Sequence, residues 1–383
     1  MDFDLTEEQR LLQESVGKLI ADAYDFEKRK AYAREPSGYS EARWAQFAEL
    51  GLLGLPFPEK LGGSGGTPVE TMIAMEAFGR GLVLEPYLAT VILAGGLLRL
   101  AGSVAQQQEL IPAIATGKLR LAFAHTERQS RYDLADVAAT ARSMGGRYTL
   151  NGQKGVVLHG DSADRLIVSA RTAGGPRESE GISLFLVDPR SDGVSIQGYP
   201  TVDGLRAAEI GFRDVKLDAD ALVGVKDQAL PAISRVIDAA IAAVSSEAVG
   251  AMTELHELTV EYLKTRKQFG VPIGSFQALQ HRAVDMLVSL EQARSMAYLA
   301  TMMADSEDTA ERRRMISAAK VQVGRSARFV GQQAIQLHGG IGMTMEYKAG
   351  HYFKRISMID TLFGDADHHL AIVARAGGLI DTI

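Results

Sequence analysis

Apolar side chains recur at helical spacing through the first third of the chain. The recurring positions are Leu5, Leu12, Val16 and Leu19 on one face, then Trp44, Phe47 and Leu50 on another. This spacing predicts amphipathic helices that each bury one face. A further helix is expected to begin near Thr67, because a threonine N-cap followed by proline at the first helical position is a strong start signal. Residues 1–116 are therefore predicted to form a helical domain.

The pattern changes to alternation between about residues 118 and 225. Short runs such as RLAFAH, DRLIVSAR and ISLFLVD alternate in character and are separated by Gly, Asp and Pro. Such alternation, interrupted by turn residues, predicts antiparallel strands and hairpins. One turn is expected at residues 150–152, where Asn-Gly lies between alternating segments. We predict a middle β domain over residues 117–226.

Long helical periodicity returns after about residue 228. One segment runs to about residue 266, a second from 275 to about 305, a third ends near 340, and a last one begins at 365. This periodicity predicts a helical bundle over residues 227–383. The order of helices, β domain and helices places the chain in the α+β class, in which a nucleotide site would lie between domains.

Composition narrows the class of protein. The chain has 383 residues, no cysteine and a formal net charge of −6. The lack of cysteine excludes disulfides, thiolate metal sites and cysteine nucleophiles, and the acidic charge argues against nucleic acid as the main partner. The stretch MDFDLTEEQR is acidic, unlike a signal or transit peptide, and no run of about 18 apolar residues predicts a membrane span. We expect a cytoplasmic protein without a metal site, a nucleic-acid partner or a membrane partner.

Two motifs in the last third of the chain carry chemistry. YLKTRKQFGVPIGSFQALQ (262–280) places Arg266 before a corner broken by glycine and proline. A guanidinium suits phosphate oxygens because its planar fork can pair with two of them. QLHGGIGMTMEY (336–347) has glycines that would let a ligand approach the backbone closely. Taken singly, a surface loop with an incidental arginine and a helix stop are alternative interpretations.

Together these motifs resemble those of the acyl-CoA dehydrogenase family in register, and the likeness covers essentially the whole chain. It implies an N-terminal helical domain, a middle antiparallel β barrel-like domain and a C-terminal four-helix bundle. It also implies FAD as the cofactor, between the β domain and the bundle, with its adenine end reached by a partner chain. The residues that the resemblance assigns to cofactor binding in the bundle and tail are Arg266, Gln268, Phe269, Phe276, Gln277, Gln336, Gly339, Gly340, Asp365 and Asp367.

The β domain continues the resemblance, with departures. Phe123 and Thr126 match a family strand that lines the flavin, where Thr126 could hydrogen-bond the ring edge; an ordinary strand threonine is the alternative. Asn-Gly-x-Lys at 151–154 matches the start of the second flavin strand, which usually continues Trp-x-Thr or Trp-x-Ser. This chain has Val156-Val157-Leu158 instead. Val156 and Leu158 would therefore contact the flavin only through backbone groups.

The family's general base is missing from its usual position. In the family a carboxylate removes the α-proton of the thioester while the β-hydrogen leaves as hydride to the flavin. Aligning the family pattern Tyr-Glu-Gly-Thr with DTLFGDADHHL (360–370) pairs the Gly with Gly364 and the Glu with Phe363. Phe363 cannot accept a proton, although its backbone N–H could hold a thioester oxygen.

Nearby carboxylates are candidate substitutes for that base. Asp365 and Asp367 begin the last helix, where capping and the helix dipole are the alternative explanation. Some family members carry the Glu on the first long helix of the bundle, at a position that is Ala240 here. Glu247 lies seven residues further along that helix, about 10 Å away on the same face. Its apolar surroundings predict either a catalytic purpose or a charge paired across a subunit interface.

Three functions are compatible with these residues. The first is FAD-dependent α,β-dehydrogenation of an acyl-CoA in fatty acid metabolism. Its partners would be an electron-accepting flavoprotein and a homotetramer, or a heterotetramer with a second acyl-CoA dehydrogenase-like subunit. The second is a non-catalytic subunit that completes its partner's FAD site, and the third is a flavin oxidase or monooxygenase. The tail is most similar to the small subunit of pimeloyl-CoA dehydrogenase and related heteromeric enzymes, which implies a dicarboxylyl-CoA as one candidate substrate.

Overall fold

The computed structural model describes residues 4–377, and contacts within the chain divide it into two compact units. A helical unit contains the residues up to 31, residues 68–83 and those from 241 onward. A β unit contains residues 32–67 and 84–240. Helix α7 (Leu230–Thr265) begins in the β unit and continues in the helical unit.

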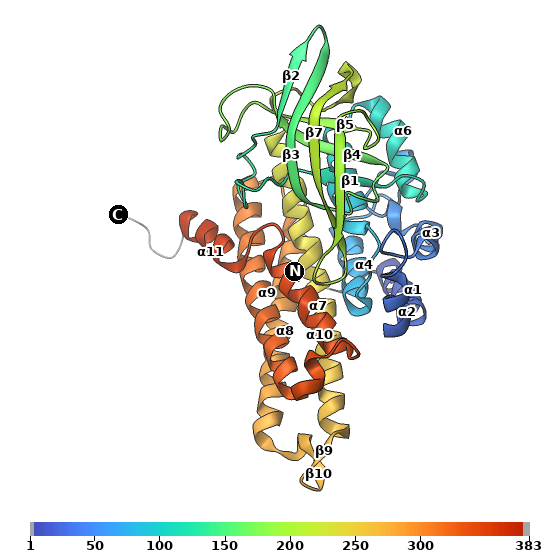
Figure 1. Cartoon of the computed structure of the whole chain (residues 1–383). Helices are drawn as coiled ribbons and strands as arrows, with labels where there is room; N and C mark the ends of the chain where they lie inside the picture. The colour runs from blue at the N-terminus through green and yellow to red at the C-terminus, as the bar shows by residue number, and fades with distance from the viewer. Residues whose placement is uncertain (1–3, 378–383) are drawn as a thin grey trace. The chain divides into compact units, whose positions relative to one another are not determined.

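Within the described chain, eight strands of the β unit form one sheet (Figure 1). The strand order is β6-β7-β3-β2-β4-β5-β8, with β1 beside β4. Most neighbours are antiparallel, but β1 and β2 each pair with β4 in parallel. The strands are β1 (Leu121–Ala124), β2 (Thr140–Met144), β3 (Arg147–Leu158), β4 (Arg165–Arg171), β5 (Ile182–Val187), β6 (Val194–Pro200), β7 (Arg206–Leu217) and β8 (Leu222–Val223).

The core of the β unit follows the alternation that predicted the strands. Its buried side chains include Leu150, Leu166, Val168, Phe185 and Ile210, which come from four different strands. Helices of the same unit are α3 (Glu41–Glu49), α5 (Gly95–Ala101) and α6 (Val104–Ala115), with a π-helical stretch at Leu88–Ala94.

The turn between β2 and β3 lies at Gly145-Gly146, so the turn predicted at residues 150–152 is wrong. Both glycines have positive φ, 62° and 81°, which a tight hairpin turn requires and which glycine adopts freely. Asn151 and Gly152 lie inside β3, where the register against β7 shifts. The Asn151 side chain donates to the Asp214 carboxylate and accepts from the Asp214 N–H. Asn-Gly therefore marks a β-bulge here rather than a chain reversal.

The helical unit combines long helices from the C-terminal region of the sequence with shorter helices from the N-terminal region. Helices α8 and α9 are 27 and 30 residues long, and α9 packs against α8, α10 and α11 (Figure 1). Helix α4 begins at Pro68, as predicted. The helices are α1 (Glu7–Ala23), α2 (Phe26–Tyr32), α4 (Pro68–Gly81), α8 (Gln277–Met303), α9 (Thr309–His338), α10 (Lys348–Thr361) and α11 (Ala366–Arg375).

Helix α7 is more apolar than the sequence analysis expected. Within residues 4–377 it is the one helix long and apolar enough to cross a membrane. However, 94% of that apolar window is buried inside the protein, so its side chains already have an apolar environment. The helix is therefore the core helix of this fold.

Candidate functional site

Residues 266–277 form an exposed corner at one end of the helical unit (Figure 1). Helix α7 ends at Thr265, and the short strands β9 (Lys267–Gln268) and β10 (Val271–Pro272) pair across Phe269 and Gly270. Both tip residues have positive φ, 54° and 83°. The Ile273 N–H donates to the Arg266 carbonyl at 2.8 Å and closes the corner.

The corner exposes aromatic and cationic side chains together. Phe269 is 92% exposed, and its ring lies edge-to-face against Phe276 at 6.2 Å between centroids. Arg266 and Lys267 are exposed beside it, as is Gln277 at the start of α8. A large aromatic side chain left in water is typical of a surface that a ligand or a partner covers. Guanidinium, aromatic ring and amide suit the phosphates and the base of a dinucleotide.

The second motif lies at the end of α9. Gln336 is exposed, and the helix ends at His338, beyond which Gly339 has a φ of 62°. A Cβ added to Gly339 or Gly340 would meet no atom of this chain within 4 Å. The glycine pair therefore borders open space where a ligand or partner can approach the backbone. These residues and those of the corner fit the cofactor that the resemblance implies.

The predicted flavin strand of the β unit holds Phe123 in the core. Phe123 is buried and stacks on His125 at 4.6 Å between ring centroids. Burial, followed by the nearby Lys154 ammonium, lowers the pKa of His125 to about 4, so the ring is neutral at pH 7. The Thr126 hydroxyl lies 3.3 Å from His125 Nε2 and is half-buried. Phe123 therefore supports the predicted flavin strand by packing in the core, whereas Thr126 keeps a hydroxyl group near the surface of the β unit.

The next predicted flavin strand, β3, is bulged at Val156, the position where the resemblance implies tryptophan. Val156 has a φ of 50°, rare for a β-branched residue, and the β3–β7 register shifts between Lys154 and Val157. The Val156 side chain is exposed, and its N–H donates to Glu209 Oε1 at 3.2 Å. Leu158 is half-buried. The bulge thus directs an aliphatic side chain outward from this strand.

Two buried groups, Lys154 and Glu127, form an ion pair that supports these two strands and that was not predicted. Lys154 Nζ lies 2.6 Å from Glu127 Oε1 and also donates to the Ser169 hydroxyl. Glu127 in turn accepts the N–H groups of Ala138 and Ala139. Lys154 was part of the Asn-Gly-x-Lys motif, and Glu127 lies next to Thr126. The missing signal was their pairing across 27 residues, which no local pattern contains.

The tail loop between α10 and α11, which bears the predicted position of the base, has an unusual backbone. Phe363 is half-buried with a φ of 60°, and Gly364 has a φ of 116°. Asp365 is the N-cap of α11, and its side chain accepts the His368 N–H at 2.8 Å. Asp367 is exposed in the first turn of the same helix. Lys320 on α9 donates to the Gly364 carbonyl of this loop and to two carbonyls at the end of α10, contacts that were not predicted.

Glu247 lies in a buried ion pair within the chain. Arg355 of α10 donates from Nε and Nη2 to the two carboxylate oxygens, each at 2.6 Å, and both side chains are 5% exposed. The interpretation of Glu247 as a paired charge therefore describes the structure, although the partner belongs to this chain. At the alternative base position on the same helix, Ala240 is fully buried.

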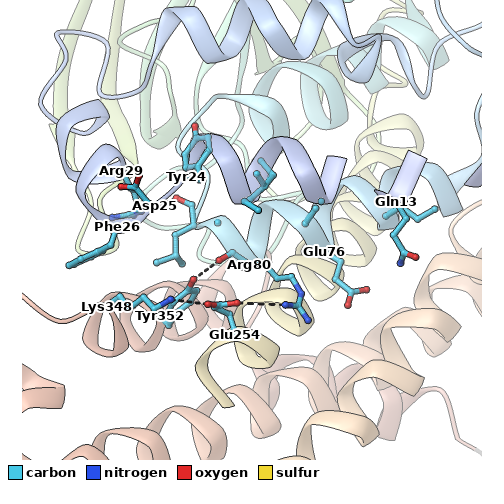
Figure 2. A pocket seen from close by; sticks show the side chains of 17 residues that line it. Gln13, Tyr24, Asp25, Phe26, Arg29, Glu76, Arg80, Glu254, Lys348 and Tyr352 are labelled. Atoms are coloured by element: carbon cyan, nitrogen blue, oxygen red, sulfur yellow. Dashed lines mark hydrogen bonds and ion pairs between the residues drawn. The ribbon is translucent and has the colours of Figure 1, made fainter. Parts of the chain in front are cut away.

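A cavity of about 700 Å³ in the helical unit contains none of the predicted site residues (Figure 2). Helices α1, α2 and α4 contribute most of its lining. Several of its charged groups are paired, since Glu254 binds Lys348 at 2.8 Å and Glu76 binds Arg294 at 2.6 Å. The Tyr352 hydroxyl donates to the Arg80 carbonyl at its edge.

Comparison with known protein families covers nearly the whole chain. Residues 6–118 match the acyl-CoA dehydrogenase N-terminal domain, residues 122–217 the middle domain and residues 231–378 the C-terminal domain. This succession confirms the predicted fold class of helical, β and helical domains. The exact boundaries at 116 and 226 stay predictions.

Individual relatives agree with the family match. The chain is 32% identical over 314 residues to the caffeyl-CoA reductase-Etf complex subunit CarC of Acetobacterium woodii, which covers 81% of this chain and 82% of the relative. The solved FAD complex of PigA is 27% identical with a TM-score of 0.90, covering 98% of each chain. The ChsE4-ChsE5 complex from Mycobacterium tuberculosis is 25% identical with a TM-score of 0.86, again covering 98% of each chain.

The motifs at residues 262–280 and 336–347 therefore led to the correct family, and the three domain models extend that result along the chain. The chain belongs to the acyl-CoA dehydrogenase family of flavin-dependent oxidoreductases.

Proposed function

We propose that this chain is one subunit of a heteromeric FAD-dependent acyl-CoA dehydrogenase whose second subunit supplies the proton-abstracting carboxylate. The observation that carries the proposal is the tail loop. Phe363 occupies the position that the family gives to glutamate, and a phenyl ring cannot take up a proton. General-base assistance is worth about 10²–10⁴ in rate, so a chain without it needs another source of that carboxylate.

Two of the three candidate substitutes in this chain, Glu247 and Asp365, are engaged in structural interactions, whereas Asp367 is exposed in the first turn of α11. Both Glu247 oxygens accept hydrogen bonds from the Arg355 guanidinium, which would have to break before the carboxylate met a substrate. Asp365 caps α11 through the His368 N–H. Breaking a buried, bidentate ion pair is costly, since the remaining charge loses its compensation. Neither Glu247 nor Asp365 is therefore well suited to act as the base.

FAD is the cofactor of this fold. When bound, it accepts the hydride that leaves the β-carbon of the acyl-CoA thioester. In our proposal Arg266 binds phosphate oxygens, and Phe269 and Phe276 provide the apolar surface of the corner. Gln336 offers an amide, and the glycine pair that follows α9 leaves room for the ligand. The exposure of these side chains in the single chain supports a site that is completed by a partner subunit.

The comparisons support the kind of partner. One relative is named as a subunit of a caffeyl-CoA reductase-Etf complex, and one solved neighbour is a complex of two named proteins. We extend this to the present chain as an electron-transferring flavoprotein that removes electrons and a second acyl-CoA dehydrogenase-like subunit in a heterotetramer. A cytoplasmic acyl-CoA, with a dicarboxylyl-CoA as one candidate, is the proposed substrate.

Co-expression tests this proposal. The chain would be purified together with an acyl-CoA dehydrogenase-like subunit encoded beside it that carries Tyr-Glu-Gly-Thr or a helix-borne glutamate. We expect a stable complex with bound flavin that is bleached anaerobically by an acyl-CoA. Changing the second subunit's glutamate to glutamine should abolish bleaching without releasing flavin. Unchanged bleaching after that substitution, or rapid reoxidation of the reduced flavin by air, would instead support a self-sufficient enzyme or an oxidase.

A further inference from the structure

Lys320 lies in the interior of the helical unit, and all three N–H donors of its ammonium are hydrogen-bonded. The side chain is 0% exposed. Nζ donates to the Ile359 carbonyl at 2.8 Å, to the Asp360 carbonyl at 2.7 Å and to the Gly364 carbonyl at 2.8 Å. An ammonium has three N–H donors, and each finds a backbone acceptor here.

These carbonyls belong to the segment that leads into the tail loop. Helix α10 ends at Thr361, so the carbonyls of Ile359 and Asp360 are among the last four of the helix and have no intrahelical partner. A cation at a helix C-terminus is also favoured by the helix dipole. The third carbonyl, that of Gly364, follows Phe363 directly. Lys320 therefore ties the end of α10 to the far side of the loop.

A second buried side chain fixes the carbonyl in between. His369 Nε2 lies 3.1 Å from the Phe363 carbonyl, and Nδ1 lies 3.1 Å from the Ser317 hydroxyl. Because a carbonyl only accepts, Nε2 carries the proton and Nδ1 accepts from Ser317. Burial, then the Lys320 charge, lowers the pKa of His369 to about 3, which keeps this ring neutral.

The loop needs such support because its backbone is strained. A φ of 60° at Phe363 is uncommon for a bulky residue and persists only where surrounding structure holds it. A Cβ added to Gly364 would lie 2.6 Å from ring atoms of His368 and His369, so the histidines pack directly on this turn.

The three hydrogen bonds from the Lys320 ammonium to the carbonyls of Ile359, Asp360 and Gly364 are called the clamp below. The charges around Lys320 make the clamp sensitive to the protonation state of this lysine. The surrounding charged and titratable groups are Asp360 of α10, Asp365, His368 and His369 of the tail, and Arg313 and Arg328 of α9. Burial outweighs the attraction of Asp360 and Asp365 and lowers the Lys320 pKa to about 8. A neutral amine has two N–H donors, so one of the three carbonyls would lose its partner.

We propose that Lys320 is a positioning residue, whose ammonium fixes the loop bearing Phe363 through three carbonyl hydrogen bonds and releases part of it on losing its proton. The inference rests on the proposed function in one respect: it takes this loop to border the substrate. The clamp itself depends only on contacts inside the helical unit.

Hydrogen–deuterium exchange of the full chain, followed by mass spectrometry, tests the clamp without any activity. In Lys320→Met, amides of residues 359–369 should exchange at least roughly tenfold faster, since hydrogen bonds to a charged group are lost. Lys354→Met on α10, which leaves the clamp intact, is the matched control. Lys320→Gln retains two donors and should give an intermediate rate, which also serves if the methionine variant does not fold. Unchanged loop exchange in a folded Lys320 variant would overturn the proposal.

The pH profile separates a clamp from general instability. After correction for intrinsic exchange, loop protection in the unaltered chain should fall between about pH 7 and 9, and the Lys320→Met profile should be flat. Between about pH 8 and 10.5 the unfolded chain binds more protons at this lysine, so the group's contribution to global stability rises with pH. A protection loss confined to the loop therefore cannot come from global unfolding. Protection that stays constant across this range would contradict the protonation step.

A binding measurement links the clamp to the proposed site. In the complex with the second subunit and with FAD bound, acyl-CoA should perturb the flavin spectrum more weakly when the chain carries Lys320→Met than when it carries Lys354→Met. If acyl-CoA leaves the spectrum of the unaltered complex unchanged while the exchange results hold, the clamp stands and the proposed function is wrong. If binding is equal in the two variants despite a loosened loop, the positioning role is overturned.

Discussion

At the scale of single residues, Glu247 is the side chain whose environment most affects the functional account. Its carboxylate and the Arg355 guanidinium are both buried and share two hydrogen bonds of 2.6 Å. Such a pair adds little stability compared with apolar residues, but removing one member leaves an uncompensated charge. A structural role and a catalytic role therefore predict different consequences of substitution.

Glu247→Gln should lower the free energy of unfolding by about 3 kcal/mol or more, because it leaves Arg355 buried without its counter-charge. Urea denaturation measures this effect. Glu257→Gln, at an exposed position of the same helix, should change stability by less than about 0.5 kcal/mol. The double variant Glu247→Leu with Arg355→Leu should recover most of the loss. Unaltered stability combined with loss of flavin reduction would identify Glu247 as the base.

Asp365→Ala should cost about 0.5–2 kcal/mol of stability through loss of the α11 cap. Asp365→Asn keeps an oxygen that can accept the His368 N–H, so it should retain most of that stability and all of the activity of the assembled enzyme. Thermal unfolding and flavin bleaching would be measured side by side. If the asparagine variant is stable but inactive, the carboxylate takes part in proton transfer.

Glu85 gives the β unit a predictable pH dependence. Burial raises the pKa of Glu85 to about 8, above the ordinary 4.5. The folded state then binds more protons than the unfolded state between these values, so stability contributed by this group falls as pH rises from about 5 to 8. Glu85→Gln should flatten that decline and leave the variant about 1–3 kcal/mol more stable at pH 8 than the unaltered chain. The measurement is the urea midpoint of the unaltered chain and of Glu85→Gln from pH 5 to 8.5. If the two midpoints change with pH in parallel, the prediction is wrong.

At the scale of elements, the long periodic helices and the strands could be predicted because their burial pattern is local. The sequence signal failed where two structures share one pattern. Asn151-Gly152 suits a bulge as well as a turn. The real turn at Gly145-Gly146 was not predicted, because the residues on either side of it do not alternate clearly between apolar and polar. Helix α10 was not predicted, although it supplies Arg355 to Glu247. Contacts such as Lys320 with the tail join distant segments, so no local pattern could reveal them.

The corner between α7 and α8 is an element whose exposure predicts its role. Phe269→Ala should leave the stability of the chain within about 0.5 kcal/mol, because the ring packs little within the chain. Flavin retention or subunit assembly should weaken by roughly tenfold or more if the ring is covered in the functional complex. Val225→Ala, another exposed apolar position, is the control and should affect neither property. Flavin content after gel filtration and the assembled mass provide the measurements.

At the scale of the whole molecule, the protein has the complete domain succession of its family. In our proposal Phe363 takes the position of the family's base, so this chain keeps the features that bind the cofactor but lacks the carboxylate. A second subunit is then the proposed source of that carboxylate.

The most direct measurement is an anaerobic titration of the FAD-reconstituted single chain with acyl-CoAs of different lengths, following flavin absorbance, beside the variant Phe363→Glu. We predict that the unaltered chain binds flavin and is not bleached by any of these acyl-CoAs. Phe363→Glu, which restores a carboxylate at the family's position, should bleach with at least one. If the unaltered chain is bleached at a comparable rate, a base already exists within it and the proposed heteromeric function is wrong.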